Sequence, residues 1–310
     1  MKIISKKETL KSTIPLMSLF VGLNALIIAL STYFNIISFL LLIFLPLIST
    51  IYSLNTKKKY FLIYLLCSIF LSSLITFNDL SLVFLNLIPS LIQGLVFSII
   101  IEKNKDGTIA YMCSIFIMYV FYIIFIPILN LIYDINILKT IIDLLGFTAY
   151  QNELNLIIYG LLFLSCSLEI FIVCIITKGE IKKFGYELSF FKNLSIFILI
   201  GTLISSSATI IFYFLKLYQN SYTFLAISFI YSLILTIQLI KNKPLIFLPL
   251  TILFLIIDWV LYILFSKNNN YFININYFSI FGIIISVVGI AWYFYLMKKG
   301  GVIKWLIYLN

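Results

Sequence analysis

Two acidic residues, Glu169 and Asp258, lie inside long apolar stretches of the chain. A carboxyl group can bind a ligand or carry a proton. Ionisable side chains are so costly inside a lipid bilayer that they are functional candidates by default. For Glu169 the sequence leaves two interpretations open: a ligand- or proton-handling role, or a protonated side chain bonded to a neighbouring helix. For Asp258 the adjacent Trp259 and a position near the outer interface favour the structural interpretation. Both residues are candidate ligand-binding residues.

Uncharged polar side chains also occur inside apolar runs. Asn24 and Gln93 could line a cavity between the first and fourth predicted spans, and hydrogen bonds between helices would explain them equally well. Small residues recur at a spacing of four, as in Ala25 with Ala29 and Gly94 with Ser98. Such pairs predict positions where two helices approach closely.

The composition determines the class of protein that carries these residues. Hydrophobic residues make up 63% of the chain and charged residues 10%, with a mean hydropathy of +1.16. A soluble domain needs far more polar surface than this to cover its core. The chain is therefore expected to be an all-α, polytopic transmembrane helical bundle, in contact with lipid and not with nucleic acid.

A bilayer core requires roughly 20 apolar residues per helix. Ten runs of about this length predict ten spans: residues 13–33, 36–54, 60–77, 82–101, 109–133, 154–177, 193–215, 222–240, 244–265 and 277–297. With a cytoplasmic N-terminus, eighteen of the 21 lysines fall inside and three outside. Lysine and arginine concentrate in cytoplasmic loops, so this division predicts that both termini are cytoplasmic.

Two segments are the longest of those between spans. Residues 134–153 have the periodicity of an amphipathic helix and are predicted to lie along the outer interface or to cap a cavity. Residues 178–192 hold four lysines and two glutamates and are predicted to form a cytoplasmic basic loop. This loop divides the chain into a six-helix module, residues 1–177, and a four-helix module with a short interfacial tail, residues 193–310.

Several kinds of chemistry are not indicated. The chain has no histidine and no arginine, so it offers neither an imidazole base nor a guanidinium clamp for phosphate. It contains no P-loop, HExxH or GxSxG motif. Its four cysteines lie in apolar runs without a CxxC pair, which indicates packing residues. We therefore expect no enzymatic activity, no cofactor and no metal site.

Four stretches carry a resemblance to a known family: IPLMSLFVGLNALIIAL, LLIFLPLIST, LNLIPSLIQGLVFSIIIEKNKDG and the central ITKGEIKKFGYELSFF. They resemble the YybS-like family of predicted bacterial membrane proteins over residues 14–191. That family is similar in layout to the six-helix substrate-binding (S) subunits of energy-coupling-factor vitamin transporters. In S subunits, small residues of the first helix contact a shared transmembrane subunit that works with ATPases. The resemblance implies this role for Ala25 and Ala29, and such a subunit as a partner. It also implies a location in the bacterial cytoplasmic membrane.

Two functions remain in view. The first is a small-molecule binding or transport subunit, which would use Glu169 and Gln93 beside a lid at residues 134–153. The second is a non-catalytic membrane scaffold or assembly factor of the bacterial envelope, which would present the cytoplasmic surface around residues 178–192. A ligand-sized cavity of about 300 Å³ or more would favour the first.

Overall fold

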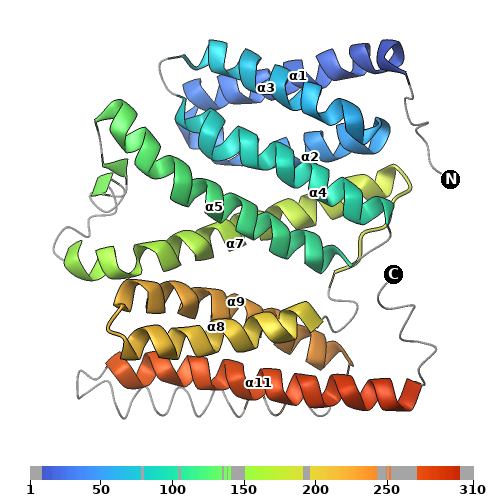
Figure 1. Ribbon diagram of the computed structural model, residues 1–310. Coiled ribbons are helices and arrows are strands. Elements are labelled where there is room, and N and C mark those ends of the chain that lie inside the picture. Colours follow the sequence, from blue (N-terminus) through green and yellow to red (C-terminus); the bar gives the residue numbers. More distant parts are fainter. Residues whose placement is uncertain are drawn as a thin grey trace. The chain divides into compact units, whose positions relative to one another are not determined.

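The computed structural model describes residues 9–77, 80–103, 106–134, 136–137, 139–140, 151–190, 196–242, 249, 251–252 and 271–300. Within these ranges the chain is built from helices and short connections, and no β-strand occurs. Figure 1 shows the helices in sequence colours, from blue α1 to red α11. The all-α architecture expected from the composition is confirmed.

Seven helices of the described part are long and apolar enough to cross a membrane: Lys11–Tyr33, Lys58–Ile75, Val83–Glu102, Gly107–Tyr133, Ile157–Lys183, Phe197–Phe214 and Tyr218–Lys241. Two shorter apolar helices, Leu42–Asn55 and Ser279–Tyr295, accompany them. The protein is therefore a multi-pass helical membrane protein. The predicted run at residues 244–265 lies almost wholly outside the described residues, so the count of ten spans stays a prediction. The cytoplasmic placement of the two ends also stays a prediction.

The chain divides into two compact units, Met1–Leu145 with Ser165–Phe190, and Gly146–Leu164 with Phe191–Asn310. The first unit contains α1 (Leu10–Tyr33), α2 (Asn35–Asn55), the short helix η1 (Lys58–Tyr60), α3 (Phe61–Ile75), the π-helical turn η2 (Val83–Leu87), α4 (Ile88–Glu102), α5 (Gly107–Tyr133) and the second half of α7 (Gln151–Lys183). The second contains the first half of α7, α8 (Ile196–Phe214), α9 (Tyr218–Asn242) and α11 (Tyr271–Gly300). The sequence-based division at residues 178–192 stays a prediction.

Small residues hold the helices of each unit close together. In the first unit, a Cβ added at Gly94 of α4 would lie 2.3 Å from Ser49 Cβ of α2. The Ser49 hydroxyl donates to the carbonyl of Leu91 at 2.8 Å. In the second unit, α8 and α9 are joined by the hydroxyls of Ser206 and Ser228, 2.7 Å apart. These serine hydroxyls thus find hydrogen-bond partners on neighbouring helices, as a membrane interior favours.

Helix α3 shows how the chain adapts to lipid. Its buried face carries Tyr64, Ser68 and Ser72, whereas Leu66 and Phe70 are among its exposed residues. A soluble helix has the opposite distribution. Here the apolar side chains meet the hydrocarbon, and the hydroxyl groups turn toward other helices, where they can find partners.

Helix α7 ends in a defined turn. The amide of Tyr186 donates to the carbonyl of Ile181, and that of Gly185 to Lys182, with Gly185 at φ 78°. These two bonds form a Schellman motif. The helix therefore extends six residues beyond the end predicted at residue 177, and the first part of the predicted basic loop, 178–183, is helical.

The chain after Gly185 folds back onto the start of α5. The Gly107 amide donates to the Ser189 carbonyl at 2.7 Å, while the Asp106 side chain caps the helix by accepting from the Thr108 amide at 2.9 Å. Leu188 is buried. The segment that follows α7 is thus anchored to α5 within the first unit.

Candidate functional site

Glu169 lies near the middle of α7, thirteen residues into the span Ile157–Lys183. Glu169 is partly buried, and its carboxyl group lies within electrostatic range of Tyr122 of α5 and of Cys166, one turn earlier on α7. Nearby, the hydroxyls of Tyr111 and Ser167 lie 3.0 Å apart and join the same two helices. The helix extension past residue 177 places Glu169 farther from the inner end of its helix than the sequence predicted.

Asn24 is fully buried in α1 and faces α3. Its amide nitrogen donates to the Tyr64 hydroxyl at 2.7 Å and to the Ser68 hydroxyl at 3.1 Å. The Tyr64 ring is in turn stacked on Tyr52 of α2, with ring centroids 4.0 Å apart. The amide oxygen of Asn24 has no hydrogen-bond partner. One side of this amide therefore links two helices, and the other side remains an available acceptor.

Gln93 is buried in α4 and faces α5. Its amide nitrogen lies 3.6 Å from the sulfur of Met118, a weak acceptor, and its amide oxygen has no hydrogen-bond partner. Asn24 and Gln93 thus bond to different helices, α3 and α5, so the structure does not bring them to a common partner. The cavity predicted between the first and fourth spans stays a prediction.

The remaining candidates divide into described and undescribed positions. Ala25 is buried within the first unit, and Ala29 is partly buried. Their contact with a partner helix stays a prediction. Asp258 lies outside the described residues, as does most of the predicted lid at residues 134–153. Where that segment is described, Asp134 ends α5 in a left-handed conformation and the Asn130 side chain accepts from the Ile137 amide at 3.0 Å.

A polar cluster that the sequence analysis missed joins the ends of α2 and α4. The Lys58 ammonium group donates to the hydroxyl of Ser53 at 3.0 Å and to that of Ser98 at 2.6 Å, and lies 3.4 Å from Glu102. From the sequence, Lys58 is predicted only to mark a cytoplasmic connection. The sequence does contain a signal for this cluster. Lys58 and Glu102 lie at the same predicted membrane face, and Ser53 and Ser98 lie about one helical turn from them along the chain.

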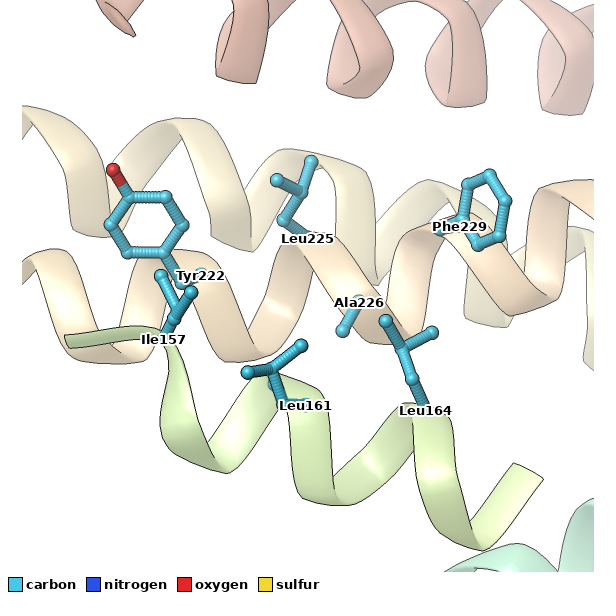
Figure 2. A pocket seen from close by; sticks show the side chains of 8 residues that line it. Ile157, Leu161, Leu164, Tyr222, Leu225, Ala226 and Phe229 are labelled. Atoms are coloured by element: carbon cyan, nitrogen blue, oxygen red, sulfur yellow. The ribbon is translucent and has the colours of Figure 1, made fainter. Parts of the chain in front are cut away.

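One open groove lies between the first half of α7 and α9, in the second unit. Its volume is about 300 Å³. Ile157, Leu161 and Leu164 of α7 point toward α9, as Figure 2 shows, and the α9 residues Tyr222, Leu225, Ala226 and Phe229 also line the groove. The lining is almost entirely apolar, and none of the candidate residues predicted from sequence contributes to it. The groove therefore offers shape without the polar groups that orient a polar ligand.

Within the described residues no three histidine, cysteine or acidic side chains gather as a metal site would require. Comparisons with protein-family models, with curated proteins and with solved structures found no match to this chain.

Proposed function

We propose that this membrane protein is a non-enzymatic small-molecule binding or transport subunit, similar in role to the substrate-binding subunits of vitamin transporters. The observation that carries the proposal is Glu169, a carboxyl group near the middle of a membrane-spanning helix and close to Tyr122 of a neighbouring helix.

An acidic side chain at this depth in the membrane has a free-energy cost, and an apolar side chain could fill the same space without it. An ionisable side chain near the bilayer centre costs on the order of 2.5–3.5 kcal/mol when charged. A leucine would fill the same space without that cost. Glu169 is therefore best explained as a group that binds a polar ligand or exchanges a proton, with Tyr122 as its neighbour across the α5–α7 contact.

The experiment compares the wild type with Glu169→Gln, which keeps the shape of the side chain and removes its charge. Both proteins, in lipid nanodiscs, are heated in the presence of a panel of water-soluble vitamins and small amines. A ligand that binds only the folded state raises the unfolding temperature. We expect at least one compound to stabilise the wild type and to stabilise Glu169→Gln less.

Glu180→Gln is the matched control, because Glu180 lies on the same helix but is paired with Lys183 at 2.6 Å near its exposed end. It should keep the wild-type response. An undiminished response in Glu169→Gln would contradict the proposed site.

The partner is tested separately by co-purification from native membranes. A pair of ATPases with a transmembrane subunit would support transport. A cell-envelope or division protein would instead favour the scaffold function.

A further inference from the structure

A line of polar side chains is buried between α1 and α3. We call it the polar seam: Asn24 and Ser31 of α1, with Tyr64, Ser68 and Ser72 of α3. The residues of α3 recur every four positions and so share one helix face. All five side chains are buried, although the face of α3 that points away from the seam is apolar and exposed.

Three groups in the seam have no hydrogen-bond partner: the amide oxygen of Asn24 and the hydroxyls of Ser31 and Ser72. Buried polar atoms are almost always paired in native proteins, and an unpaired group costs more in a membrane than in water. The Asn24 amide also points into the seam, because its nitrogen donates to Tyr64 and Ser68. These atoms therefore indicate a binding site.

The two unpaired serines lie at the same level. Successive helices joined by short turns run antiparallel, so α1 and α3 run in the same direction. Asn24 bonds to residues 64 and 68 and so lies level with about residue 66 of α3. Ser31 follows Asn24 by seven residues on α1, and Ser72 follows residue 66 by six on α3, which is about two helical turns in each helix. The seam continues to Thr76, the C-cap of α3, and the next residue, Phe77, is exposed. It thus approaches one end of the helix pair.

The chemistry of the seam selects the class of ligand. Its five side chains are uncharged, so an ion would lose its hydration without gaining a counter-charge. The free oxygen of Asn24 requires a donor, while the serine hydroxyls can both donate and accept. We propose that the polar seam is a hydrated site for small uncharged molecules that donate a hydrogen bond to Asn24, of which water is the smallest. This site is independent of Glu169.

The chain contains its own controls for a test. Cys67 precedes Ser68 on α3 but is exposed on the apolar face, whereas Cys166 and Cys174 are buried in α7. The thiolate is the reactive form of cysteine, and it forms in water and not in hydrocarbon. A thiol placed in a hydrated seam should therefore react faster than these native thiols.

The experiment uses full-length Ser72→Cys in lipid nanodiscs with the native cysteines left in place. Methyl methanethiosulfonate, a small uncharged thiol reagent, is added, and its reaction at each cysteine is followed by peptide mass spectrometry. We expect the thiol at position 72 to react about tenfold or more faster than Cys67, Cys166 and Cys174. Adding Asn24→Leu should reduce that rate toward the rate of Cys67.

A rate at position 72 no greater than that of Cys67 would overturn the proposal. If Ser72→Cys does not fold, Ser31→Cys replaces it, because its labelling rate reports on the same polar seam from α1. Glycerol distinguishes the occupants: slower labelling in the seam alone indicates a bound solute, and unchanged labelling indicates water. Because the readout is thiol reactivity, its failure leaves the Glu169 experiment unaffected.

Discussion

At the scale of single residues, glycine decides how closely two helices can pack. A Cβ at Gly94 would lie 2.3 Å from Ser49 Cβ and 2.7 Å from the Thr50 nitrogen of α2. Neither atom of α2 can move far to make room for the added Cβ. The Thr50 nitrogen belongs to the helix backbone, and the Ser49 side chain is held by its hydrogen bond to the Leu91 carbonyl. Gly22 of α1 differs, because no heavy atom lies within 4 Å of its added Cβ.

Gly94→Ala should therefore separate α2 from α4 and lower the free energy of unfolding by about 1–3 kcal/mol. Gly22→Ala should leave stability unchanged or raise it by up to about 1 kcal/mol, because alanine favours helix more than glycine does. Thermal unfolding of both variants in the same detergent measures the difference. Equal unfolding temperatures would show that the α2–α4 contact is not as close as described.

At the scale of elements, the end of α7 depends on a residue that tolerates a left-handed backbone. Gly185 adopts φ 78° and completes the turn that sends the chain back to α5. The left-handed backbone conformation costs residues with a Cβ roughly 1–2 kcal/mol. Gly179 is located six residues earlier on the same helix and has open space around its added Cβ.

Gly185→Ala should destabilise the last turn of α7 by about 1 kcal/mol and loosen the segment that contacts Gly107. Gly179→Ala should not have this effect. Hydrogen exchange of the amides in residues 181–190 provides the measurement, with faster exchange expected only for Gly185→Ala. Identical exchange in the two variants would argue against the Schellman turn.

At the scale of the whole molecule, the distribution of lysines predicts which connections face the cell interior. Lys182 lies near the end of α7 on the predicted inner side, and Lys139 follows α5 on the predicted outer side. Both residues are exposed. Single cysteines at these two positions therefore report opposite membrane faces.

On intact cells, a membrane-impermeant thiol reagent should label Lys139→Cys and leave Lys182→Cys unlabelled. Permeabilised cells supply the control, in which both positions should react. Labelling of Lys182→Cys in intact cells would reverse the predicted topology and change the assignment of every inner and outer segment.

The positions of the helices could be predicted well because membrane insertion acts on local hydrophobicity. Predicted runs such as 109–133 and 222–240 coincide closely with α5 and α9. The sequence predicts an end of α7 that is too early, because Lys182 and Lys183 indicate a loop, whereas the helix continues to Lys183 and Gly185 then permits the turn. Charge marks where a span leaves the lipid, whereas backbone geometry decides where a helix stops.

The candidate site could be predicted only in part. Asn24, Gln93 and Glu169 were recognisable because polar groups are costly in lipid, and the spacing of Gly94 and Ser98 indicated a close helix contact. Their partners were not recognisable, since periodicity assigns a residue to a face of its own helix and not to a neighbour.

The sequence alone determined that this is a helical membrane protein, because insertion of a segment into a bilayer depends on the hydrophobicity of that segment. It also identified the residues that are too polar to face lipid. Only the tertiary structure decided that Asn24 meets Tyr64 and Ser68 and that Lys58 joins Glu102. Those pairings depend on which helices pack together, and packing is decided by the shapes of surfaces far apart in the chain.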